Sequence, residues 1–182
     1  MRWYQSITQL SLWIARAPAL HVAGAAVLVS TGSCKPEDAL PGTALGSFAV
    51  TAVLSTNSCG SGLDPTNPWK FDAELSLDGN TLYFRGNDEE EVSAPLDSEN
   101  TATCTSVVNS QASTESACTL SLKTIYTIKL DSATAPKTSS GSLRFEHSAL
   151  GSNKCASQLS ENGGIYDELP CAVEYSYTAL KK

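Results

Sequence analysis

The sequence predicts an all-β domain, an antiparallel meander of about eight strands that closes into a small β-barrel or, alternatively, forms a β-sandwich. Three observations predict this class. Apolar and polar residues alternate with a period of two through most of the chain after residue 46, as in strands that bury one face. No segment has a convincing helical pattern of more than two turns. The alternating segments follow one another closely, and strands joined by short turns pair antiparallel.

The expected strands can be placed in order from this alternation. They cover residues 48–54, 71–77, 82–84, 92–96, 102–108, 118–131, 142–148 and 171–180. The second and third strands are joined by Asp78-Gly79-Asn80. Asp-Gly between two alternating runs is a strong hairpin signal, because glycine adopts positive φ easily. The fourth strand is short, and the fifth has a weaker pattern than the others.

The last three expected strands each gather apolar side chains on one face. These are Cys118, Leu120, Leu122, Tyr126, Ile128 and Leu130, then Leu143 and Phe145, and finally Val173, Tyr175 and Tyr177. The first and last strands of the chain are long and lack the usual protection of sheet edges. We therefore expect residues 48–54 to pair antiparallel with residues 172–180, which removes two edges and favours the barrel. The same pairing brings Cys59 close to Cys171.

The first 33 residues are predicted to be a secretory signal peptide. They contain none of the 19 acidic residues of the chain, and Arg2 and Arg16 precede an apolar run at residues 17–29. Small residues follow at positions 30–33, which completes the basic, apolar, small order of a cleaved signal. The apolar run is shorter than the ~20 residues that a membrane-spanning helix needs.

The string Thr31-Gly32-Ser33-Cys34 resembles the lipobox of bacterial lipoproteins. In that family the cysteine is diacylated and becomes the new N-terminus, so Cys34 is the expected lipidation site. Two acyl chains give stable membrane anchoring. The alternative is ordinary cleavage near Ser33, with Cys34 joining a disulfide. Lys35 stands where an Asp would resemble an inner-membrane retention signal, which favours the outer membrane.

The expected organisation has three parts. Residues 1–33 are the signal peptide, residues 34–46 are a lipid-anchored tether, and residues 47–182 are the β-domain. The tether is inferred from its proline, glycine and acidic residues, which are typical of linkers. The protein is thus expected in the cell envelope, attached to the membrane through its N-terminal lipid.

Five further cysteines are candidates for disulfides: Cys59, Cys104, Cys118, Cys155 and Cys171. Export permits disulfides. No pair has C-x-x-C spacing, so a zinc ribbon and a thioredoxin-type site are both disfavoured. If Cys34 is lipidated, five cysteines allow two bridges and leave one cysteine outside them. If it is not, three bridges can form.

Two pairing schemes remain open from the sequence. In the local scheme Cys104 pairs with Cys118 and Cys155 with Cys171, and Cys59 is left over. Each local loop of about 15 residues would stabilise the fold by roughly 3 kcal/mol in the chain-entropy model. In the rival scheme Cys59 pairs with Cys171, because one follows a strand and the other begins one.

Charge and motifs exclude several functional classes. A net charge of −7 disfavours binding to nucleic acid and electrostatic attachment to anionic lipid. His147 is the only histidine after residue 33, and no G-x-S-x-G string occurs, so we predict no catalytic residues. The acidic run at residues 88–91 lacks the spacing of a calcium loop and is expected to be a solvated hairpin end. We predict no metal site and no cofactor.

Two strings resemble a group of secreted bacterial lipoproteins of unknown function. The first is Thr56–Leu63 with Trp69-Lys70-Phe71, and the second joins Gly163-Gly164 to Leu169–Tyr175. The resemblance covers most of residues 46–180. Its motifs consist of cysteines and turns, so it implies a fold and supplies no catalytic residues.

We therefore expect a bacterial envelope lipoprotein whose β-domain is a non-enzymatic binding or structural interaction module. The alternative is a lipocalin-like carrier of a small hydrophobic ligand, and an envelope hydrolase is less favoured. The side chains expected to face inward are bulky, which favours a filled interior over an empty one. They are Phe48, Leu54, Phe71, Leu75, Leu122, Tyr126, Ile128, Phe145 and Tyr175. Partner contacts are expected in loops 60–68, 109–117 and 151–169; the sequence leaves the ligand or partner unidentified.

Overall fold

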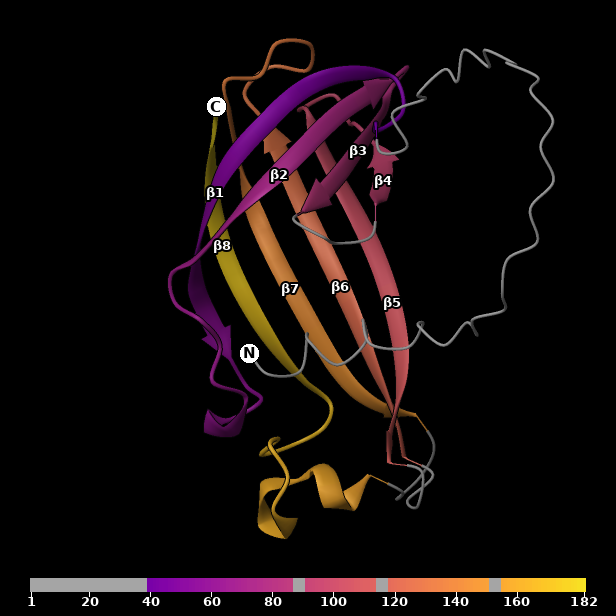
Figure 1. Cartoon of the computed structure of the whole chain (residues 1–182), viewed down its shortest axis with the longest axis vertical. Coiled ribbons are helices and arrows are strands. Elements are labelled where there is room, and N and C mark those ends of the chain that lie inside the picture. Colours follow the sequence, from indigo (N-terminus) through magenta and orange to yellow (C-terminus); the bar gives the residue numbers. More distant parts are fainter. Residues whose placement is uncertain (1–38, 87–90, 114–117, 151–154) are drawn as a thin grey trace, which may run out of the picture. The chain divides into compact units, whose positions relative to one another are not determined.

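The computed structural model describes residues 39–86, 91–113, 118–150 and 155–182, which form one all-β domain (Figure 1). The predicted fold class is confirmed: eight antiparallel strands in this part of the chain make one nearly closed, barrel-shaped sheet. The strands are β1 (Thr43–Asn57), β2 (Trp69–Asp78), β3 (Thr81–Gly86), β4 (Val92–Pro95), β5 (Thr101–Ser113), β6 (Cys118–Leu130), β7 (Thr138–Leu150) and β8 (Cys171–Lys181). Three short 3-10 helices lie between them: η1 (Ser61–Leu63), η2 (Ala156–Gln158) and η3 (Ser160–Asn162).

The expected pairing of the first and last strands is confirmed. The sheet order is β4-β3-β2-β1-β8-β7-β6-β5, and β1 and β8 run antiparallel with Val50 opposite Ala179 and Leu54 opposite Tyr175. Since β1 also pairs with β2 and β8 with β7, the first and last strands lie in the middle of the sheet. The two edges of the sheet are β4 and β5, between which no ladder forms.

The Asp78-Gly79 hairpin is also confirmed. Asp78 lies opposite Thr81 in the β2–β3 ladder, and Gly79 has a φ of 59°, which glycine adopts without the steric cost of a Cβ. The next turn is fixed to this hairpin, because the Asn80 side-chain amide donates to the carbonyl oxygen of Leu96 at 2.7 Å. The hairpin and the short strand β4 thus form one unit.

Several strands are longer than the alternation predicts. β1 begins at Thr43, so residues 43–46 of the expected tether already pair with β2, and the Ser76 hydroxyl donates to the carbonyl oxygen of Pro41 at 2.6 Å. β5 continues to Ser113 and β7 starts at Thr138, both inside segments rich in Ser and Thr. Ladders to the long strand β6 extend these segments, since β-branched threonines fit a pleated sheet well.

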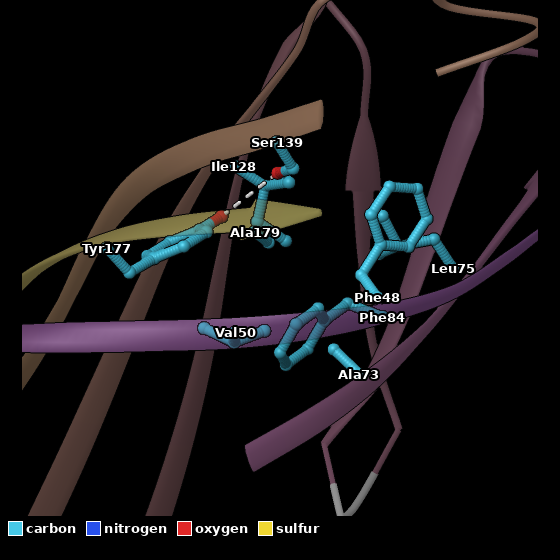
Figure 2. A pocket seen from close by; sticks show the side chains of 9 residues that line it. All are labelled: Phe48, Val50, Ala73, Leu75, Phe84, Ile128, Ser139, Tyr177 and Ala179. Atoms are coloured by element: carbon cyan, nitrogen blue, oxygen red, sulfur yellow. Dashed lines mark hydrogen bonds between the residues drawn. The ribbon is translucent and has the colours of Figure 1, made fainter. Parts of the chain in front are cut away.

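The interior is filled by side chains near the end of the barrel where β1 begins. Phe48, Leu75 and Ile128 are among the most buried residues, as predicted. Figure 2 shows the cavity there, whose volume is about 10 Å³, room for about one water molecule. Its lining consists of Phe48, Val50, Ala73, Leu75, Phe84, Ile128, Ser139, Tyr177 and Ala179. The hydroxyls of Tyr177 and Ser139 lie 3.4 Å apart, and burial raises the pKa of Tyr177 to about 12.

The inner face is less covered toward the opposite end. Of the side chains expected to face inward, Leu54, Phe71, Leu122 and Phe145 are only partly buried. The reason lies in the short strands β3 and β4, which have 6 and 4 residues. β3 packs over the near part of β6, where the rings of Phe84 and Tyr126 are 5.2 Å apart. Beyond that point the sheet has an open inner face.

The disulfides follow the strand order and correct the local scheme. Cys59 is bonded to Cys171 and Cys118 to Cys155, while Cys104 is free and buried. Two bridges and one cysteine outside them match the expected number in the described residues. The local pairs are wrong because β5 and β6 form a long hairpin: Cys104 lies opposite Tyr126, about 25 Å along the ladder from Cys118. The bridge between Cys59 and Cys171 instead joins two paired strands.

Candidate functional site

Both disulfides lie at the end of the sheet where β1 and β7 finish and β6 and β8 begin. Residues 155–171, termed the clamped loop, are therefore held covalently at both ends, Cys155 by β6 and Cys171 by the end of β1. Loops 60–68 and 155–169, in which we expected partner contacts, lie at this same end (Figure 1). Of the third expected loop, residues 109–113 belong to β5, and residues 114–117, like residues 151–154, lie outside the described part of the chain.

The clamped loop has a compact backbone of its own. The Ser160 amide donates to the carbonyl oxygen of Tyr166 at 2.7 Å, and the Tyr166 amide donates to the carbonyl oxygen of Gln158 at 3.1 Å. The Gly164 amide closes the turn by donating to the carbonyl oxygen of Leu159 at 2.9 Å. A Cβ on Gly164 would collide with the backbone carbonyl of Gln158, so the turn requires glycine. The loop therefore presents one defined shape.

Tyr166 attaches the clamped loop to the sheet. Its side chain is 5% exposed, and its hydroxyl lies 3.2 Å from Nδ1 of His147 on β7. Burial lowers the pKa of His147 and raises the pKa of Tyr166, so both groups are neutral at pH 7. With the tyrosine hydroxyl as donor, Nδ1 accepts and the imidazole carries its proton on Nε2. The sequence indicated neither this contact nor a role for Tyr166.

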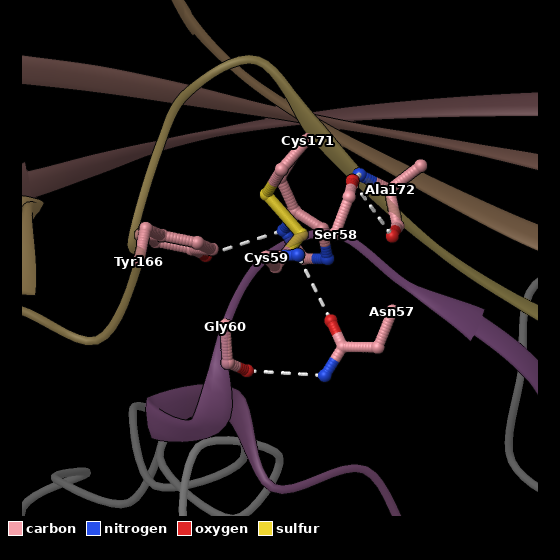
Figure 3. Close-up of a disulfide and its surroundings, with 8 residues drawn as sticks. Asn57, Ser58, Cys59, Gly60, Tyr166, Cys171 and Ala172 are labelled. Carbon is pink, nitrogen blue, oxygen red and sulfur yellow. Dashed lines mark hydrogen bonds between the residues drawn. A yellow bond between two sulfur atoms is a disulfide. The ribbon is translucent and has the colours of Figure 1, made fainter.

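The turn after β1 is fixed by side-chain hydrogen bonds around Cys59 (Figure 3). The Asn57 side-chain oxygen accepts from the Cys59 amide at 2.9 Å, and its nitrogen donates to the carbonyl oxygen of Gly60 at 3.0 Å. The Ser58 hydroxyl accepts from the Ala172 amide at 2.9 Å. An asparagine that bonds the backbone two residues on is typical of a tight turn. The disulfide to β8 thus lies in a rigid frame.

The turn after β1 also touches the clamped loop directly. The Asp167 amide donates to the carbonyl oxygen of Cys59 at 2.9 Å. Gly60 has a φ of 94°, and the position of a Cβ there is taken by the Asp167 carboxyl group. Only glycine combines this backbone conformation with so close an approach. The two loops therefore form a single surface at the end of the sheet.

An aromatic cluster lies on the open inner face beside the clamped end. The Trp69 ring centroid is 4.5 Å from that of Phe71, 5.8 Å from that of Tyr175 and 6.1 Å from that of Phe145. Trp69, Phe71 and Phe145 are partly exposed, whereas Tyr175 is buried. Such tilted and edge-on pairs stabilise a fold beyond their buried area. Trp69 is thus partly a core residue and partly a surface residue.

The described residues bring together no acid–base or metal-binding set. His147, the one histidine in this part of the chain, bonds a tyrosine hydroxyl and not a carboxylate or a nucleophile. No group of three His, Cys, Asp or Glu side chains among the described residues is placed to hold a metal ion. Residues 88–90 of the acidic run lie outside these residues, and Glu91 is exposed.

The evidence on cellular location comes from the β-domain, because the expected lipidation site is not among the described residues. Cys34 and the string Thr31–Cys34 lie outside the described residues. Within residues 39–182, the described segments include no helix long and apolar enough to cross a membrane. The two disulfides are typical of an oxidising compartment outside the cytoplasm.

Comparison with known proteins assigns neither a family nor a function to this chain. No protein-family model, no curated protein and no solved structure matches this chain.

Proposed function

We propose that the protein is a bacterial envelope lipoprotein, anchored in the outer membrane through Cys34, whose β-domain is a non-enzymatic interaction module. The contact surface in this proposal is the clamped end, formed by the clamped loop and residues 58–68. One observation carries the proposal: β1 is the first strand after the tether, and both disulfides lie at the end of the sheet where β1 finishes and not where it begins.

The dimensions of the chain support this arrangement. Thr43 is the ninth residue after Cys34, so a lipid on Cys34 lies at most about 30 Å from the start of β1. β1 has 15 residues and is about 50 Å long at the rise of an extended strand. A tether and a strand of these lengths allow the clamped end to extend away from the bilayer, where a partner in the surrounding space can contact it.

The clamped end suits binding because it is ordered before a partner arrives. Rigid loops lose less conformational entropy on binding than flexible loops do. Its exposed charged side chains are all acidic, namely Asp64, Glu161, Asp167 and Glu168, and residues 155–170 contain no Lys or Arg. A surface of this charge fits a partner that presents basic or polar groups.

The packing of the interior near the start of β1 supports the module over the hydrophobic carrier. Small-molecule sites occupy about 300–1,000 Å³, whereas the cavity in this packed part of the barrel measures about 10 Å³. Bulky residues such as Phe48, Phe84 and Tyr177 occupy the space that a carrier would leave empty.

Metabolic labelling with palmitate tests the anchor. We expect label on the wild-type chain and none on Cys34→Ala, because the acyl chains have lost their attachment atom. Cys104→Ala is the matched control, since it also removes one thiol, yet one that is buried in the domain, and it should keep the label. Equal labelling of the wild type and Cys34→Ala, or no label on any of the three, would overturn the proposal.

A further inference from the structure

The two edges of the sheet are built differently. β4 has 4 residues, ends at Pro95 and is preceded by Glu91, and short length, proline and charge are the means by which natural sheets protect an edge. β5 has 13 residues and contains neither a proline nor a charged residue. One edge is thus protected and the other is not.

The composition of β5 matches that of a strand paired on both sides. Among the strands of ten residues or more in the described structure, only β1 and β5 contain no charged residue. β1 pairs with β2 and β8, whereas β5 has a ladder with β6 alone among the strands of the described residues. An extended row of backbone N–H and C=O groups is left on the outer edge of β5.

The free part of this edge begins after its first four residues. Within those first four residues, Ala102 and Cys104 are buried, and the Asp97 amide donates to the carbonyl oxygen of Thr101 at 2.9 Å. Further along, Val107 is 56% exposed and Val108 is 51% exposed. The two valines point to opposite faces of the sheet, so apolar surface flanks the edge on both sides. Residues 105–111, termed the free edge, are therefore suited to pair with another strand.

We propose that the free edge pairs antiparallel with the free edge of a second copy of this chain, across a two-fold axis. A contact of this kind uses the same residues from both copies, so the segment must be compatible with itself. The free edge is Thr-Ser-Val-Val-Asn-Ser-Gln, and cross-strand pairs of hydroxyl and β-branched residues are favourable.

The lack of charged residues in the free edge permits a second copy as the occupant, although the two chains carry the same sign of charge. Two copies that each carry a net charge of −7 repel one another, and a contact without charged groups keeps that repulsion small. Lys123 lies opposite Val107 in the β5–β6 ladder and is paired with Glu146 at 3.3 Å. The paired edges would join two sheets into one continuous sheet, in which the valines of each copy cover those of the other.

A second copy would be one partner of the proposed interaction module, but pairing through the free edge does not depend on the lipid at Cys34. Dimer formation and lipid anchoring are therefore tested separately. Sedimentation velocity is measured on the full chain carrying Cys34→Ala, so that no acyl chain holds copies together. We expect a concentration-dependent dimer. Adding Val107→Glu should raise the dimer dissociation constant at least about tenfold, because it places like charges across the two-fold axis.

Val53→Glu is the matched control. Val53 is 49% exposed on β1, which has no free edge, so this variant adds the same charge and should leave the dimer unchanged. Both variants should keep the melting temperature of their parent. A parent that stays monomeric up to its solubility limit, or equal dissociation constants for the two variants, would overturn the proposal.

Cysteine cross-linking tests the geometry in the full chain in cells. Single cysteines are placed at positions 105–110 of a Cys104→Ser chain, and pairs of differently tagged copies are co-expressed. In an antiparallel pair across a two-fold axis, a residue before the axis in one copy faces a residue equally far after it in the other. Cross-links should therefore form only between positions whose two residue numbers add up to the same value. The single position on the axis should link to the same position of the second copy. Cross-links without such a pattern, or cross-links only to a different protein, would contradict pairing between copies.

Discussion

The hydroxyl of Tyr166 lies 3.2 Å from Nδ1 of His147 and joins the clamped loop to the inner face of the sheet. The loop is already held at both ends by disulfides, and this contact fixes its middle. The nearest ring contact of His147 is with the same tyrosine, at 5.3 Å between centroids. The arrangement gives the only histidine of the domain a structural role.

Tyr166→Phe should destabilise the domain without unfolding it. The substitution keeps the ring but leaves an imidazole nitrogen of the half-buried His147 without its partner, which costs up to about 1–3 kcal/mol. Chemical denaturation gives the change in the free energy of unfolding. Tyr83→Phe is the control, since Tyr83 is only partly buried and its hydroxyl has no partner among the described residues. Equal stability of the Tyr166→Phe chain and the wild type would show that the contact does not hold the loop.

The stability of the domain should fall as the pH drops below about 6.5, the pKa of an unperturbed histidine. Burial lowers the pKa of His147 in the folded protein, so the unfolded chain takes up its proton first. The contribution of neutral His147 is therefore complete above pH 6.5 and is lost as the pH falls toward the lower pKa of the folded state.

Thermal melts between pH 7.5 and pH 5.5 measure this effect, and His147→Gln is the comparison. A glutamine does not titrate, so the variant should lose stability less steeply over the same range. Parallel curves for the two proteins would mean that His147 does not titrate differently on folding.

Thiol counting should find one cysteine outside the disulfides in the mature chain. Cys104 is buried, and burial raises the pKa of its thiol to about 11, so alkylation should require denaturant. Intact mass should then show one alkyl group without reductant and five after reduction. Five alkyl groups without reductant would contradict both bridges.

Loss of the bridge between Cys59 and Cys171 should be more harmful than loss of the other. The two bridges span 112 and 37 residues, which corresponds to about 5 and about 4 kcal/mol in the chain-entropy model. The double variants Cys59→Ala/Cys171→Ala and Cys118→Ala/Cys155→Ala can be compared by their denaturation midpoints. The reverse order of stability would show that local packing, and not chain entropy, decides the effect.

Truncation before Cys171 should unfold the whole domain. β8 lies between β1 and β7, so its removal leaves one edge of each of these two long strands unpaired and splits the sheet in two. Circular dichroism should show loss of the β signal and of a cooperative melt. A chain that ends at Leu180 keeps nearly all of β8 and is expected to melt cooperatively. If the shorter chain did so too, β8 would not be needed to close the sheet.

Much of the fold is predictable from the sequence because its signals are local. Period-two alternation places all eight strands, and Asp78-Gly79 places the hairpin. The pairing of the first and last strands follows from the need to satisfy two unprotected edges, although the free edge that remains belongs to β5. Residues 43–46 and 109–113 were not predicted to be strand. They are extended because they pair with neighbouring strands, and their own composition does not indicate it.

The site depends on contacts that a linear pattern does not contain. The local scheme for the disulfides failed because loop length favours near neighbours, whereas the sheet brings Cys118 to Cys155 across 37 residues. The half-open inner face follows from how far β3 and β4 reach over β6, and no single segment encodes that. The contact between Tyr166 and His147 likewise depends on how the clamped loop folds back. Glycines at positions 163 and 164 were the one sequence signal that this loop turns sharply.

The N-terminus of the mature protein tests the central claim most directly. Mass spectrometry of the N-terminal peptide, taken from protein recovered from the cell envelope, identifies both the cleavage site and any modification. The proposed anchor predicts a peptide that begins at Cys34 and carries two acyl chains on that residue. A peptide that begins elsewhere, or an unmodified Cys34, would contradict the lipid anchor and with it the orientation that places the clamped end away from the membrane.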